Sequence, residues 1–172
     1  MNLKKFAAEN GLVTYVDSPD DFNAHVEREL NTMTRINLVP PSELMDQHLF
    51  AEFREIKMVP KALARSLTAH GVAGVSSRIP KVFTLNTGHV RFFYNKGAYL
   101  FQRFNELREE LRRRGINFNE LSELDSDGVY ARNSVFLGDY NPTPEALSII
   151  RQRINEKIAM KPSWYRYYGE TL

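Results

Sequence analysis

Cysteine is absent from this sequence of 172 residues. Its absence excludes disulfides, thiolate catalysis and thiolate zinc sites, and it favours a reducing compartment. No apolar run approaches the roughly 20 residues that a membrane-spanning helix needs. The opening MNLKKFAAENG carries charges where a signal peptide has its apolar core. We therefore expect an intracellular protein with no signal peptide and no membrane partner.

The sequence also lacks internal repeats, low-complexity tracts and a Gly-rich phosphate loop. What it has is the 42% hydrophobic content of an ordinary globular domain, in a chain long enough to bury a core. Residues 1–32 carry three Lys/Arg and six Asp/Glu, which leaves twenty and fifteen for residues 33–172. A basic body fits a polyanionic partner such as nucleic acid, although a charge of this size is common among soluble proteins.

The spacing of apolar residues predicts an all-α fold. We expect one compact domain of about three main helices with long loops over residues 33–172, preceded by a short N-terminal extension over residues 1–32. The extension itself has helical spacing in its second half. In the body, Ser42 is predicted to cap a helix that ends near Ile56. One face of this helix is an apolar stripe formed by Met45, Leu49, Phe53 and Ile56.

Further helices follow the same pattern. A shorter helix is predicted to begin at Pro60 and end at Gly71, before an irregular loop over residues 72–88. A long helix is predicted over residues 98–114, with inward side chains at Phe101, Phe104, Leu107 and Leu111. Residues 116–142 are polar and rich in turn-forming residues. Thr143 and Pro144 then form an N-cap and first-turn pair for a last helix.

Two titratable residues interrupt the first apolar face. His48 and Glu55 are seven residues apart and lie on nearly one line of the predicted helix, at the edge of its apolar stripe. A half-buried Glu55 would suit acid–base chemistry. From spacing alone an ordinary solvated glutamate is the better interpretation. A metal set of His48, Glu52 and Glu55 is disfavoured because no second helix offers a matching Glu-x-x-His.

The C-terminal segment RQRINEKIAMKPSWYRYYGETL combines cations with aromatic rings. Arg153 and Lys157 are four residues apart and share a helix face. After the helix, Arg166 stands among Trp164, Tyr165, Tyr167 and Tyr168. Rings and cations of this kind can stack on bases and bind phosphates. The alternative interpretation is an aromatic plug that closes the core, and one tail can do both.

Three segments carry a resemblance to a known family: MTRINLVPPSELMDQHLFAEFREI, LNTGHVRFFYNKGAYL and RINEKIAMKPSWYRYYGETL. They resemble the pyrimidine-dimer DNA glycosylases of the endonuclease V type, found in a tailed phage and in chlorella viruses, and the resemblance covers residues 33–172. It implies a DNA-repair enzyme that cuts the glycosidic bond of the 5′ pyrimidine in a UV-induced cyclobutane dimer. Strand cleavage by β-elimination would follow. The implied partner is double-stranded DNA containing dimers or abasic sites, with a monomeric protein, no cofactor and no metal.

Position by position, the resemblance implies that the α-amine of Thr34 is the nucleophile and that Glu55 is the essential carboxylate. An α-amine, with a pKa of roughly 7.7 to 8.0, is a ready nucleophile near neutral pH. The implied DNA-binding residues are Arg35, Gln47, His48, Arg54, Arg153, Lys157, Trp164, Tyr165, Arg166 and Tyr167. One family arginine falls on Met58 here, with Lys57 beside it.

The extension decides whether this chemistry can run. With residues 1–32 attached, Thr34 has an amide nitrogen and no nucleophilic lone pair. Translation beginning at Met33, or removal of the extension by a protease, would free the amine. If the extension stays attached, the alternative is a non-catalytic protein that binds damaged DNA. A metal-dependent nuclease is a more distant alternative.

Overall fold

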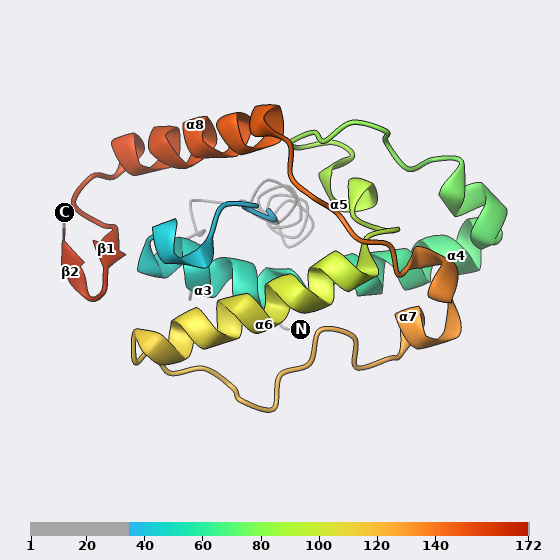
Figure 1. The fold of residues 1–172 in the computed structure, drawn as a ribbon, viewed down its shortest axis with the longest axis horizontal. Helices are drawn as coiled ribbons and strands as arrows, with labels where there is room; N and C mark the ends of the chain where they lie inside the picture. Colours follow the sequence, from blue (N-terminus) through green and yellow to red (C-terminus); the bar gives the residue numbers. More distant parts are fainter. Residues whose placement is uncertain (1–34, 172) are drawn as a thin grey trace, which may run out of the picture. The chain divides into compact units, whose positions relative to one another are not determined.

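The computed structural model describes residues 35–171. Thr34 and the predicted helix of the N-terminal extension lie outside the described residues. The described part is mainly helical, so the all-α prediction is confirmed (Figure 1). The longer helices are α3 (Asp46–Glu55), α4 (Met58–Ser76), α6 (Gly97–Arg113) and α8 (Pro144–Met160). The shorter ones are η1 (Pro41–Glu43), α5 (His89–Phe92), α7 (Val129–Arg132) and η2 (Ser134–Phe136), and a hairpin of β1 (Arg166–Tyr167) and β2 (Glu170–Thr171) ends the chain.

The core forms where α3 packs along α6. In Figure 1, α6 runs beside α3, and α8 crosses the upper part of the same unit before the chain turns into the hairpin. Phe53 of α3 stacks on Phe104 of α6 with ring centroids 4.9 Å apart. Leu49, Leu107 and Leu111 are fully buried around this pair. Burial of each such side chain stabilises the fold by about 1.5–3 kcal/mol, so these two apolar stripes fix the relative position of the two helices.

The start of α3 differs from the prediction. Ser42 does not cap the helix: it lies inside the 3₁₀ turn η1, Leu44 is extended, and α3 begins at Asp46. The extended backbone places Leu44 at 0% exposure in the core. Arg114 donates from its guanidinium to the carbonyls of Pro41, Ser42 and Leu44, which replaces the hydrogen bonds that a continuous helix would have made.

The helix predicted to end at Gly71 is longer than expected. Gly71 has a φ of 67° and a ψ of 176°, which interrupts α4, and the helix resumes and runs to Ser76. Glycine is suited to this position because it has no Cβ to clash at positive φ. Along the described residues, no helix is both long enough and apolar enough to cross a bilayer.

Two further expectations have opposite outcomes. Phe101 was predicted to point inward but is 38% exposed, because Leu100 takes the inward position at 0% exposure. The start of α8 is confirmed: Thr143 Oγ1 accepts a hydrogen bond of 3.1 Å from the backbone N–H of Ala146, with Pro144 in the first turn. The turn-rich stretch 116–142 supplies Tyr130 and Phe136 to the core.

Candidate active site

Glu55 is the last residue of α3, and its side chain is buried. Its exposure is 3%, so it is more buried than the sequence predicted, and the solvated interpretation is wrong. Neither carboxylate oxygen has a hydrogen-bond partner in the part of the chain that the structure describes. Buried polar atoms without partners are rare and costly in folded proteins. A carboxyl group without a partner can form hydrogen bonds with a ligand that binds in the site.

Burial also changes the acidity of Glu55. It raises the pKa of the carboxyl from 4.5 to about 8, and the neighbouring Glu52 adds to the increase. Arg54 and Arg35 act in the opposite direction because their positive charges favour the carboxylate. Desolvation dominates, so the side chain holds a proton near neutral pH unless a further positive charge approaches.

Arg35 enters the same site from the beginning of the described chain. Burial lowers the pKa of its guanidinium, the nearby charge of Arg153 lowers it further, and Glu55 and Tyr165 raise it. These electrostatic interactions show that residues far apart in sequence lie near one another in the fold. Of the residues predicted from the sequence, the structure therefore gathers Arg35, Glu55, Arg153 and Tyr165.

His48 lies near the beginning of α3, seven residues before Glu55. Its ring packs against that of Tyr165, with centroids 4.6 Å apart and the planes tilted by 39°. Burial lowers the pKa of His48 to about 4, and the charges of Arg35 and Lys157 contribute. Its Nδ1 has no hydrogen-bond partner among the described residues. A neutral imidazole in this position adds no positive charge to the site and keeps a ring nitrogen for a ligand.

Gln47 holds the aromatic tail in place. Its Nε2 donates to the Trp164 carbonyl at 2.6 Å, and its Oε1 accepts from the backbone N–H of Arg166 at 3.0 Å. Between these two anchors Tyr165 points inward at 6% exposure, while Trp164 is 50% exposed. Tyr165 thus closes the core, as the plug interpretation predicts, while Trp164 keeps an exposed ring, and stacking of that ring on bases stays a prediction. Gln47 makes contacts within the protein, and its binding to DNA stays a prediction.

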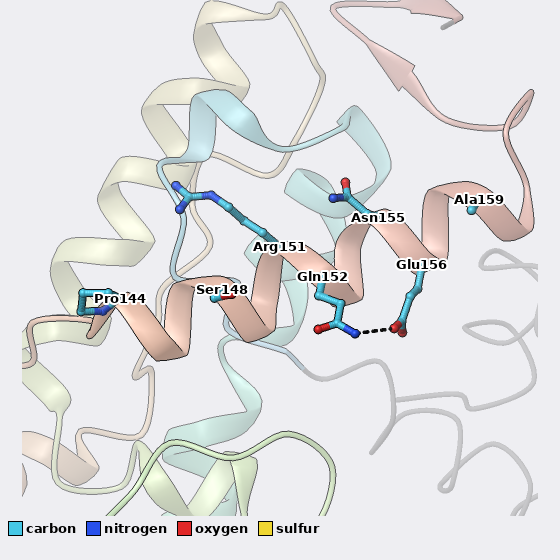
Figure 2. Close-up of a pocket in the computed structure, with 7 residues that line it drawn as sticks. All are labelled: Pro144, Ser148, Arg151, Gln152, Asn155, Glu156 and Ala159. Atoms are coloured by element: carbon cyan, nitrogen blue, oxygen red, sulfur yellow. Dashed lines mark hydrogen bonds between the residues drawn. The ribbon is translucent and has the colours of Figure 1, made fainter.

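Two cations of α8, Arg153 and Lys157, lie on the side of the helix that faces the core. Arg153 and Lys157 are both half-buried, and Arg153 also contacts Glu156 at 3.5 Å. The opposite side carries an open depression lined by Pro144, Ser148, Arg151, Gln152, Asn155, Glu156 and Ala159 (Figure 2). None of the residues predicted for the site lines this depression. The unpartnered carboxyl of Glu55 lies elsewhere, near the charges of Arg54 and Arg35.

Arg54 and Lys57 flank the carboxyl on its own segment. Arg54 is half-buried and its guanidinium lies 5.6 Å from the Phe50 ring centroid. Lys57 Nζ donates to Ser122 Oγ at 2.8 Å, which fastens it to the loop after α6. The family arginine falls on Met58 in this chain, and the neighbouring Lys57 makes its hydrogen bond within the protein.

Sequence reasoning missed a second group of buried polar residues. The side chain of Glu52 pairs with Arg103 of α6, and His89 of α5 is 2% exposed. All three contact the backbone of residues 36–39, directly after Arg35. A signal was present, because Glu52 and Arg103 interrupt two apolar helix stripes at positions where a charge needs a partner.

The geometry can now be set beside known proteins. A model of the pyrimidine dimer DNA glycosylase family matches residues 33–124, more than half of the chain. The chain belongs to this family. The suspected resemblance is confirmed over that segment, and membership implies DNA as the substrate and DNA repair as the process.

The matched segment contains Glu55, Arg35, His48 and the polar residues that bind the backbone of residues 36–39. Arg153, Lys157 and the aromatic tail follow the matched segment, and they reach the site by the packing of α8. Within residues 35–171 there is no group of three or more His, Asp or Glu residues that could hold a metal ion. Glu52, one member of the disfavoured metal set, is already occupied by Arg103.

Proposed function

We propose that this protein cuts the glycosidic bond of the 5′ pyrimidine of a cyclobutane dimer and then cleaves the strand by β-elimination, through an imine to the α-amine of Thr34. The observation that supports the proposal most strongly is the buried carboxyl of Glu55, which has no partner among the described residues and interacts electrostatically with Arg35. Arg35 is the residue directly after Thr34, so a free amine at Thr34 would start next to a residue of this site.

The reaction begins when the neutral amine attacks the anomeric carbon C1′. The C1′–N bond to the base breaks, the base leaves with the electron pair and takes up a proton, and the sugar ring opens to give an iminium. Removal of a proton from C2′ then expels the 3′ phosphate oxygen. Water hydrolyses the imine and releases the amine. No step requires an oxidant, a reductant or a metal.

Glu55 suits this sequence because its charge responds to what is near it. With no DNA in the site, the carboxyl of Glu55 has a pKa of about 8. A positive ammonium or iminium beside it would favour the carboxylate, since an opposite charge within about 4–6 Å lowers the pKa of a buried acid. The developing cation on the sugar is thus stabilised by a carboxylate that it helps to form. The same group can move the protons that departure of the base and β-elimination require.

The cations around Glu55 fit the phosphates of a damaged strand. Arg35, Arg153 and Lys157 lie near His48 or near each other, and the planar guanidinium of arginine binds a phosphate with two hydrogen bonds. The exposed ring of Trp164 can stack on a base. A dimer stacks and pairs badly, so distorting the duplex there costs less than at undamaged DNA.

Trapping of the imine with borohydride tests the proposal. Protein beginning at Met33, with that methionine trimmed, should form a covalent adduct with dimer-containing or abasic duplex, and peptide mass mapping should place the sugar on Thr34. The matched control is the 172-residue chain made resistant to cleavage between residues 32 and 34, which should bind the duplex and give no adduct. Variants Lys57→Arg and Lys157→Arg should still be trapped.

Two results would contradict the proposal. An adduct that maps to a lysine would assign the nucleophile to another amine. Cleavage of dimers by a chain whose extension is demonstrably attached would show that no free amine at Thr34 is needed. Binding without cleavage in every preparation would instead favour a non-catalytic protein that recognises damaged DNA.

A further inference from the structure

Residues 36–39 are held against the core by hydrogen bonds to their backbone. The N–H of Ile36 donates to Nε2 of His89 at 2.9 Å, and the N–H of Asn37 donates to Oε1 of Glu52 at 2.9 Å. Arg103 donates from Nη1 to the carbonyl of Val39. Three side chains from α5, α3 and α6 therefore bind the backbone of one short segment, at Ile36, Asn37 and Val39.

Burial of its side chains fixes this segment further. Ile36 is 1% exposed and Val39 is 1% exposed, so their side chains are anchored in the core as well. Leu38 between them has a φ of 58°, a left-handed conformation that is uncommon for a residue other than glycine. Strained backbone persists only where the surroundings over-determine it, and such strain is concentrated at functional sites.

His89 has one defined protonation state in this arrangement. Its Nδ1 lies 2.8 Å from the carbonyl oxygen of Thr84. A carbonyl only accepts, so Nδ1 carries the proton and donates, and Nε2 is left as the acceptor for Ile36. Burial lowers the pKa of His89 to about 4, which keeps the ring neutral near pH 7. The rings of Phe83 and Phe93 pack on it at centroid distances of 5.4 and 5.3 Å.

We propose that His89 is a positioning residue for the glycosylase reaction: it fixes the backbone of Ile36 and so holds the adjoining Arg35 in the site around Glu55. Ile36 directly follows Arg35, and consecutive Cα atoms are about 3.8 Å apart, so a shift of the Ile36 backbone moves Arg35 relative to Glu55. A misplacement of about 1 Å can reduce the rate about a hundredfold. This inference rests on the proposed function.

Two substitutions separate positioning from general support of the fold. Asparagine carries an amide nitrogen near the place of Nδ1, so His89→Asn can still donate to Thr84 but has no acceptor for Ile36. Glutamine reaches the place of Nε2, so His89→Gln restores that acceptor. Both are neutral, polar and similar in size to histidine. His70 lies on the surface of α4, and His70→Asn is the matched control.

The full coding sequence is expressed for each variant, and the N-terminus is established by intact mass. We expect His89→Asn to lower the single-turnover rate of dimer cleavage and the rate of borohydride trapping at least tenfold, with the Kd for dimer-containing duplex within about threefold. His89→Gln should recover most of the rate, and His70→Asn should match the parent. The N–H of Ile36 should exchange with solvent faster in His89→Asn than in His89→Gln.

The outcomes distinguish this inference from the function on which it rests. If the parent protein is trapped on Thr34 but His89→Asn reacts at the parent rate, positioning by His89 is wrong and the proposed function stands. If His89→Asn and His89→Gln lose the same activity in proportion to lost thermal stability, His89 only supports the fold. If the parent adduct maps to another amine, both proposals fail together.

Discussion

Glu52 and Glu55 stand one helical turn apart on α3, and their surroundings are opposite. Both are buried, at 1% and 3% exposure. The carboxylate of Glu52 accepts from Arg103 Nε at 2.6 Å, from Arg103 Nη2 at 3.0 Å and from the N–H of Asn37 at 2.9 Å. The carboxyl of Glu55 has no such partner among residues 35–171.

The difference separates a structural carboxylate from a reactive one. A buried charge is tolerated when a counter-charge and hydrogen bonds compensate it, which is the case for Glu52. A carboxyl that is buried without compensation makes the folded state less stable, and a cost of this kind is typical of sites where the group is needed for chemistry. Residues of the same type, three positions apart, thus differ in compensation: Glu52 is paired within the fold, and Glu55 is the carboxyl that we propose for the reaction.

The largest expected effect is on catalysis by Glu55→Gln. The amide keeps the shape of the carboxyl but cannot become an anion or move a proton, so the rate of dimer cleavage should fall about 10²–10⁴-fold. Binding of dimer-containing duplex should stay within a few-fold. Single-turnover cleavage and a binding titration measure the two effects, with the surface substitution Glu109→Gln as control. Cleavage near the parent rate would remove Glu55 from the mechanism.

The second expected effect is on stability, and it belongs to Glu52. In Glu52→Gln the guanidinium of Arg103 stays buried without a counter-charge, so the free energy of unfolding should fall by about 3–5 kcal/mol. A double variant, Glu52→Met with Arg103→Met, removes both charges and should lose less than the single variant. Denaturant unfolding measures these values. A loss of less than about 1 kcal/mol in Glu52→Gln would show that the pair is not the support we describe.

The third expected effect is a gain in stability in Glu55→Gln, and its size depends on pH. Because its pKa is raised from 4.5 to about 8, folded Glu55 holds a proton that the unfolded chain has already released between these values. The free energy of unfolding therefore falls as pH rises through this window. Glu55→Gln has no such group, so we expect it to exceed the 172-residue parent by about 1–3 kcal/mol at pH 7. The advantage should vanish below pH 4.5. Unfolding curves at pH 4, 5.5 and 7 test this, and a pH-independent difference would contradict it.

The smallest effect concerns the cations predicted to bind phosphates, in contrast to Arg103, which neutralises Glu52. If Arg153, Lys157 and Arg166 bind phosphates, replacing one by glutamine should lower the salt slope of DNA binding by roughly one unit. Arg151 lies on the other side of α8 and pairs with Glu43 at 3.0 Å, so Arg151→Gln is the matched control. An unchanged slope together with lost thermal stability would mean that these cations serve the fold.

Prediction from sequence succeeded where local patterns decide the structure. The stripe of Leu49, Phe53 and Ile56, and the cap at Thr143, followed from residue spacing and are confirmed. It failed where a distant residue intervenes. Ser42 lost its helix because the guanidinium of Arg114, 72 positions away, takes the carbonyls of that turn.

The candidate site shows the same division. The sequence resemblance pointed to Glu55, Arg35, His48 and Arg153, and the structure places them within electrostatic reach of one another. It gave no sign that Glu52 and Arg103 would pair, since a charge at an apolar position reveals its partner only when the helices have packed. It also assigned Gln47 to DNA, which stays a prediction, and it gave no sign that this side chain would hold the tail in the folded chain.

By itself, the sequence determined the helical class, the glycosylase family and the residue types of the site, because these depend on spacing along the chain and on recurring local motifs. Only the tertiary structure decided which carboxylate is neutralised and which is left reactive. Burial and pairing depend on residues 51 positions apart, such as Glu52 and Arg103, and on how closely α3 and α6 exclude water. The acidity of Glu55 is therefore a property of the folded molecule, and so is the hydrogen bond between the N–H of Ile36 and His89.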